Sequence, residues 1–150
     1  MIPREFLVEM VQFIVLTLNG APADLNKLPE LTAVTPVEMA AKICAKETKD
    51  YDQCTSRAVV ITAAYVHDEN KIYYNVRVVH PEATGLGRSF ILHELTHWYQ
   101  GINFKTLNCD ELKKVEIQAY HVQDAYLASI GMPSKFEAKF AEKFVCHEKN

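Results

Sequence analysis

The chain has 150 residues, of which 49% are hydrophobic and 23% are charged, and its net charge at pH 7 is −3. This length fits one domain, and we expect residues 1–150 to fold as a single unit. The composition excludes a disordered or fibrous chain, and the slight negative charge argues against a nucleic-acid partner.

The first expected element is a helix within residues 1–20. At 100° per residue, the polar residues Glu5, Glu9, Gln12 and Asn19 fall on one narrow stripe, which predicts a mostly buried helix. The uncharged run over residues 10–23 is shorter than the roughly 20 residues that cross a bilayer, so we expect no membrane span. The two glutamates also interrupt the apolar run of a signal peptide. If the protein is exported, we expect that its signal has been removed.

A second helix and a β-hairpin are expected next. Residues 35–38 have the Thr-Pro-Val-Glu pattern of a capping box with proline at the first helical position, which predicts a helix over about 36–47. Residues 58–66 are nearly all apolar or β-branched, as in a buried strand, and residues 71–79 alternate as in a half-buried strand. A polar turn over 67–70 separates them, so the two strands should pair.

Three further helices follow the hairpin. One covers about residues 86–101, and a second begins with Asn108 as its N-cap and ends before Gly131. The last begins at Ser134-Lys135-Phe136-Glu137, which has the pattern of another capping box. The expected fold class is therefore α+β, with five helices and a small antiparallel sheet.

The four cysteines form an even set without the Cys-x-x-Cys spacing of a structural zinc site. The economical pairing joins Cys44 to Cys54 and Cys109 to Cys146. Disulfides would indicate an oxidising compartment, so that the protein would be periplasmic or secreted. Four buried thiols in a cytoplasmic protein are the alternative.

The candidate chemistry is concentrated in the pentapeptide His93-Glu94-Leu95-Thr96-His97. Two histidines four residues apart on a helix differ by about 40° around its axis, so both imidazoles can bind one metal ion. Glu94 points about 100° from His93, beside the ion, where a carboxylate can take a proton from an attacking water. The alternative is a pair of histidines on a solvated helix face.

A catalytic zinc site normally takes a third protein ligand. Glu116 is the best candidate because it borders the apolar stripe of the following helix. Asp110 and Glu111 are the other acidic candidates, although their position at a helix start is typical of capping residues.

These residues resemble the gluzincin clan of zinc metallopeptidases. His93-Glu94-x-x-His97 is followed by Glu116-x-x-Ala119, and the longer pattern is similar to small bacterial proteins of the form HExxHxxQ…ExxAYxxQ. The likeness covers about residues 58–131. It implies a minimal zincin-like fold, zinc bound by His93, His97 and Glu116, and Glu94 as general base. It also implies that the strand over 71–79 is a sheet edge along which an extended peptide lies.

Four polar residues beyond that ligand set are further candidates. Tyr120 stands where many gluzincins have an acidic residue, and its phenol could accept a hydrogen bond from a zinc histidine or donate one to the developing oxyanion. His121 faces solvent or the rim of the cleft and is a candidate for aiding the transition state. Gln100 and Gln123 could link the helix pair by hydrogen bonds or be ordinary polar surface.

The function expected from these residues is hydrolysis of peptide bonds by a zinc metalloendopeptidase. Its partner would be a peptide or protein substrate. Since only the last helix remains to wall the far side of the cleft, small or extended peptides are favoured over folded proteins. Two alternatives stay open. One is a catalytically inactive zincin-fold module that binds zinc or another protein, and the other is a disulfide-bonded helical interaction domain in which the motif is accidental.

Overall fold

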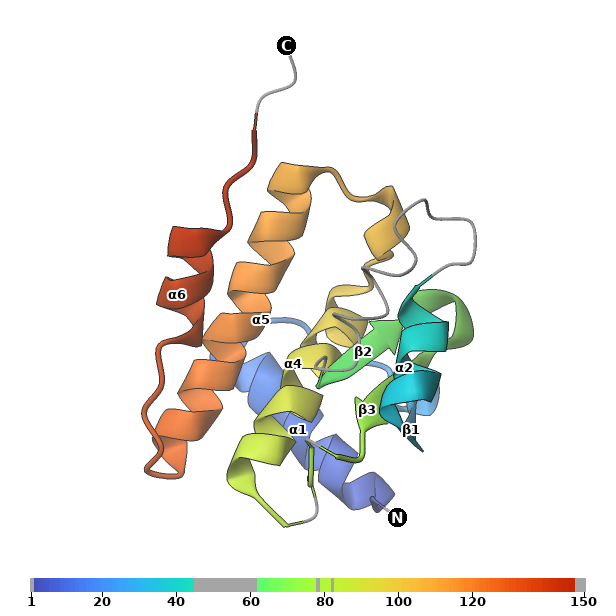
Figure 1. The fold of residues 1–150 in the computed structure, drawn as a ribbon. Helices are drawn as coiled ribbons and strands as arrows, with labels where there is room; N and C mark the ends of the chain where they lie inside the picture. The colour runs from blue at the N-terminus through green and yellow to red at the C-terminus, as the bar shows by residue number, and fades with distance from the viewer. Residues whose placement is uncertain (1, 45–61, 78, 82, 148–150) are drawn as a thin grey trace.

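The computed structural model describes residues 2–44, 62–77, 79–81 and 83–147. These residues form an α+β fold with five α-helices and a three-stranded sheet (Figure 1). The helices are α1 (Arg4–Leu18), α2 (Pro36–Ile43), α4 (Gly85–Gln100), α5 (Cys109–Ser129) and α6 (Phe136–Lys143). The strands are β1 (Glu30–Val34), β2 (Ala63–Val66) and β3 (Lys71–Asn75). No helix in these ranges is long and apolar enough to cross a membrane.

The sheet is mixed, whereas the sequence predicts an antiparallel one. β2 and β3 form the expected antiparallel hairpin, closed at Asn70 in a left-handed conformation (φ 51°). β1, which the sequence analysis did not identify, pairs parallel to β3 and gives the order β1-β3-β2. The prediction that β3 is an edge is therefore wrong, because β1 occupies its free side. Within the described residues, β2 is the edge strand beside α4.

β3 is also shorter and more deeply buried than its sequence predicts. It ends at Asn75, whose side-chain oxygen accepts a hydrogen bond from the Arg77 backbone N–H and turns the chain away. Ile72 on one face and Tyr73 on the other are at most 3% exposed, so both faces of the strand are covered. The predicted strand over residues 58–66 is seen from Ala63, and residues 58–61 lie outside the described residues.

Helices cover the two faces of the sheet (Figure 1). On one face, Tyr73 packs with Val34 and with Met39 of α2. On the other, Ile72 joins a larger core shared by α1, α4 and α5. α1 buries one side, Leu7, Met10, Val11 and Ile14, and exposes the other, where Leu16 is 80% accessible. The main core is thus enclosed by α1, α4, α5 and one face of the sheet.

The capping box predicted for α2 is confirmed, since Thr35 and Glu38 bond reciprocally. α2 ends at Ile43 and not at residue 47, because Cys44 is already extended. Residues 45–47 and the predicted Cys44–Cys54 pairing lie outside the described residues. The Cys109–Cys146 disulfide is confirmed and ties the segment after α6 to the first residue of α5.

The predicted capping box of the last helix is wrong. Asp124 of α5 accepts hydrogen bonds from the Ser134 hydroxyl and from the backbone N–H groups of Phe136 and Glu137. Ser134 therefore donates instead of capping, and α6 begins one residue later than expected, with Lys135 at the N-cap position. The N-terminus of α6 is capped across the helix pair by a residue distant in sequence.

Candidate metal centre

The two histidines of the motif lie on the side of α4 that faces α5. Thr84 caps the start of α4, where its hydroxyl accepts a hydrogen bond from the Gly87 backbone N–H, and Gly101 caps the end of the helix in a left-handed conformation. The opposite side of α4 packs into the apolar core that it shares with α1 and the sheet, where Leu95 is fully buried. His93 and His97 are 7% and 1% exposed, so the alternative of a solvated histidine pair does not hold.

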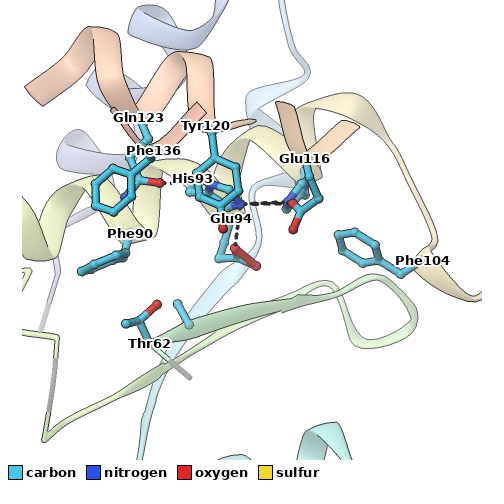
Figure 2. A pocket seen from close by; sticks show the side chains of 11 residues that line it. Thr62, Phe90, His93, Glu94, Phe104, Glu116, Tyr120, Gln123 and Phe136 are labelled. Carbon is cyan, nitrogen blue, oxygen red and sulfur yellow. Dashed lines mark hydrogen bonds and ion pairs between the residues drawn. The ribbon is translucent and has the colours of Figure 1, made fainter. Parts of the chain in front are cut away.

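Three ligand-type atoms converge between the helices, and Figure 2 labels two of the residues that carry them, His93 and Glu116. The Nε2 atoms of His93 and His97 are 3.3 Å apart, and Glu116 Oε1 lies 3.2 Å from the first and in direct contact with the second. Zinc ligands about 2.0–2.1 Å from the ion in a tetrahedron are themselves roughly 3.3 Å apart. The separations around His93 match this geometry, and two imidazoles with one carboxylate are a donor set that catalytic zinc uses.

Glu94 supplies a second carboxylate near the same point. With His93 and His97 it forms a group whose potential ligand atoms all lie within 4.8 Å of one another. Its Oε2 is 3.8 Å from His93 Nε2, farther than Glu116 Oε1. The shorter distances favour Glu116 as the third ligand and leave Glu94 beside the position that an ion would take.

The pKa values of Glu116 and Glu94 are shifted in opposite directions. Burial by itself would raise the pKa of Glu116, but hydrogen bonds and charges from His93 and His97 outweigh burial and lower the pKa to about 2. For Glu94, burial is the larger effect and raises the pKa above its ordinary value, partly opposed by His97 and His93. Glu94 is therefore the better proton acceptor, and Glu116 is the more permanent anion.

The orientation of His93 is set by a buried chain of hydrogen bonds. The Ser89 hydroxyl donates to the Leu86 carbonyl (2.6 Å), so it can accept the hydrogen bond from Gln123 Nε2 (3.1 Å). The amide oxygen of Gln123 then faces His93 Nδ1 at 3.0 Å. Because an amide oxygen only accepts, Nδ1 carries the proton, and the Nε2 lone pair is left for a metal.

His97 is oriented in the same manner on the other side of the pair. Its Nδ1 donates to the amide oxygen of Gln100 at 2.8 Å. The Gln100 amide nitrogen donates across to α5, to the Val115 carbonyl and to Gln118 Oε1. Gln100 and Gln123 thus link the helix pair by hydrogen bonds, the first of the two possibilities that the sequence left open. Gln118 was not identified from the sequence.

The backbone of β2 holds Glu94. The outward-facing N–H of Tyr65 donates to Glu94 Oε1 at 2.9 Å, so one carboxylate oxygen is tied to the sheet edge. The other oxygen faces His93. Sequence reasoning missed Tyr65 because its contribution is a main-chain N–H group, which leaves no signal in the residue type.

A cavity of about 400 Å³ opens in front of these groups. In Figure 2 the Tyr120 ring lies over His93, and the two ring centroids are 4.3 Å apart. Burial, with the nearby charges of Glu116 and Glu94, raises the pKa of Tyr120 to about 12, so its phenol stays protonated. Among the described residues its hydroxyl has no hydrogen-bond partner. The other lining residues are Thr62, Ala63, Phe90, Phe104, Gln123 and Phe136.

Three candidates from the sequence are not brought to this group. His121 lies on the exposed side of α5, where its Nδ1 is 3.2 Å from Glu137 Oε2 of α6, and it does not line the cavity. Glu111 completes the capping box with Asn108 at the start of α5. Asp110 is in the same first turn.

Comparison with known proteins adds no assignment. No protein-family model, curated protein or solved structure matches the chain.

Proposed function

We propose that this protein is a zinc metallopeptidase with a minimal zincin-like fold and the gluzincin order of ligands, acting on small or extended peptides. One observation carries the proposal. His93 Nε2, His97 Nε2 and Glu116 Oε1 converge, while a separate buried carboxylate, Glu94, is held in the same cavity by the Tyr65 backbone N–H.

In this proposal His93, His97 and Glu116 hold the zinc. When bound, zinc polarises the scissile carbonyl and lowers the pKa of the attacking water. Glu94 accepts the proton from the water and passes it to the leaving amine, a role that its raised pKa suits. The Tyr65 N–H keeps the carboxylate oriented for both transfers.

Tyr120 is the proposed donor to the oxyanion. The hydroxyl of a phenol with a pKa of about 12 remains a donor throughout the working pH range. Of the two roles that the sequence allows, donation to the oxyanion is favoured, because both histidine Nδ1–H groups already donate to glutamines. His121 is assigned to the contact between α5 and α6 and not to the reaction.

The crosslink bears on the compartment of the proposed peptidase. The Cys109–Cys146 disulfide favours an oxidising environment, and a periplasmic or secreted peptidase is the version of the proposal that agrees with it.

The test compares Glu94→Gln with His97→Ala in protein loaded with zinc. Glu94→Gln should keep the metal and lose cleavage by roughly 10²–10⁴-fold, because only the proton acceptor is removed. His97→Ala should lose both. Bound zinc is measured by elemental analysis, and cleavage by mass spectrometry of a broad synthetic peptide library. Glu142→Gln, on the exposed part of α6, is the matched control and should retain both properties.

Two results would contradict the proposal. Cleavage retained by Glu94→Gln would remove the assigned base. Zinc bound by the wild-type protein without any cleavage would favour the inactive zinc-binding module.

A further inference from the structure

A second groove lies along α6 directly beside the cavity of the metal centre. This α6 groove has a volume of about 310 Å³ and is lined by Tyr120, Phe136, Lys139, Phe140, Lys143 and Phe144. Tyr120 and Phe136 line the metal-site cavity as well, and Figure 2 shows both rings at that cavity. A chain lying across the metal centre can therefore continue onto α6.

The floor of the α6 groove is a row of aromatic rings. Tyr120 is 6.2 Å from Phe136 and 5.1 Å from Phe140, and Phe140 is stacked on Phe144 at 4.9 Å. None of the α6 residues is fully buried, so this apolar row is only half covered by the protein itself. Such a surface gains free energy when a large apolar side chain covers it.

The rim of the groove is positively charged. Lys139 and Lys143 lie one helical turn apart and are exposed. Within the described residues neither lysine has an ion-pair partner. The α6 carboxylates do not line the groove, and Glu137 is paired with His121 of α5. In a chain of net charge −3, this places two uncompensated ammonium groups beside an apolar floor.

We propose that the α6 groove is a specificity subsite that takes a large apolar residue followed by an acidic residue of an extended peptide. The inference rests on the proposed function, because it assumes that a peptide lies in the metal-site cavity. The aromatic floor receives the apolar side chain, and the lysines contact the neighbouring carboxylate. The preference applies to one side of the scissile bond, the side that lies over Tyr120 and Phe136.

Four synthetic peptides test the pairing of these features. Each is a polyalanine peptide that carries one pair, Phe-Glu, Phe-Lys, Ala-Glu or Ala-Lys. The pair is repeated along the peptide, so that it can reach the groove whichever bond lies at the metal centre. Binding to zinc-loaded Glu94→Gln is measured by calorimetry, and cleavage by the wild-type protein is measured as kcat/KM. We expect Phe-Glu to exceed Phe-Lys by roughly tenfold and Ala-Glu by roughly 10- to 100-fold. The advantage of Glu over Lys should shrink in high salt.

Variants of the lysines and of Phe140 separate the contribution of the charged rim from that of the aromatic floor. Lys139→Glu/Lys143→Glu should invert the preference to Phe-Lys and leave the advantage of Phe over Ala. Phe140→Ser should reduce the advantage of Phe and leave that of Glu. The matched control is Lys113→Glu/Lys114→Glu, the same change of charge on α5 outside the groove, which should leave both preferences unchanged.

The outcomes distinguish this inference from the proposed function. If peptides are cleaved without either preference, or if the control pair changes the preference as much as the groove pair, the α6 groove is not the subsite. If Phe-Glu binds with the expected dependence on Lys139 and Lys143 but nothing is cleaved, the groove is a peptide site and the peptidase proposal fails. Absence of both binding and cleavage overturns both.

Discussion

The α4–α5 helix pair and α6 border the same cavity, but they are held in place by different means. Between α4 and α5, His93 and His97 are each fixed by a glutamine whose amide nitrogen donates a hydrogen bond to the opposite helix. α6 has no fully buried residue. It contacts α5 through the rings of Phe136 and Phe140 on Tyr120, and the Asp124 cap and the disulfide of Cys146 hold the chain at its two ends.

This difference indicates a division of tasks. Buried hydrogen bonds fix atoms to a fraction of an ångström, which a metal site and a proton acceptor require. A helix of eight residues that buries none of them completely leaves its side chains partly exposed, which suits a wall that contacts varied substrates. Variants of α4 and α5 should therefore alter metal binding and chemistry, whereas variants of the α6 attachments should alter stability.

Among the variants that compare these two regions, the largest effect is expected for Tyr120→Phe, which removes one hydroxyl from the cavity. Loss of an oxyanion donor should lower kcat by roughly 10²–10³-fold, equivalent to about 3–4 kcal/mol. KM and bound zinc should change little. Steady-state kinetics on a cleaved peptide measures the effect. Tyr126→Phe, on the same helix and packed against Phe13, is the matched control. An equal loss in the control would assign the effect to packing.

The next effect concerns the disulfide that ties the segment after α6 to the first residue of α5. Cys109→Ser/Cys146→Ser opens a link between residues that are 37 positions apart. It should lower the free energy of unfolding by about 2–4 kcal/mol, because the unfolded chain regains conformational freedom. Urea denaturation measures this loss. Zinc stoichiometry should be unchanged in the folded protein. Loss of zinc there would mean that α6 and the metal centre are not fixed independently.

A smaller effect is expected for Gln123→Met, which removes the acceptor of the His93 Nδ1–H. Loss of this support should weaken zinc binding by roughly 10- to 100-fold, or about 1.4–2.8 kcal/mol. Competition with a chromogenic chelator measures the dissociation constant. Gln12→Met on the exposed side of α1 is the control. Unchanged affinity in Gln123→Met would show that the buried chain does not support the metal site.

The smallest effect is expected for Asp124→Ala, which removes the cap of α6. Loss of a helix cap lowers stability by about 1 kcal/mol. Hydrogen exchange should accelerate in α6 and remain slow in α4. Asp110→Ala, in the first turn of α5 where Asn108 and Glu111 supply the cap, should have a weaker effect. Equal acceleration in α4 would contradict the separation of the two regions.

Some parts of the fold could be predicted because their signals are local. The β2–β3 hairpin follows from a polar turn between apolar runs, and the cap of α2 follows from Thr35 and Glu38. The parallel pairing of β1 carries no such signal, because its partner lies about 40 residues further along the chain. The cap of α6 was missed for the same reason, since Ser134 matches the motif but Asp124 supplies the oxygens.

The sequence by itself determined which side chains can meet on a single helix. Helical periodicity brings His93 and His97 to one side of α4 and directs Glu94 elsewhere, whatever surrounds them. Only the tertiary structure decided what faces them: Glu116 across the helix pair, the Tyr65 N–H that orients Glu94, and the glutamines that fix each imidazole proton. The physical reason is that a hydrogen bond depends on the position and direction of two groups, and for groups distant in the chain the packing of the whole fold sets both.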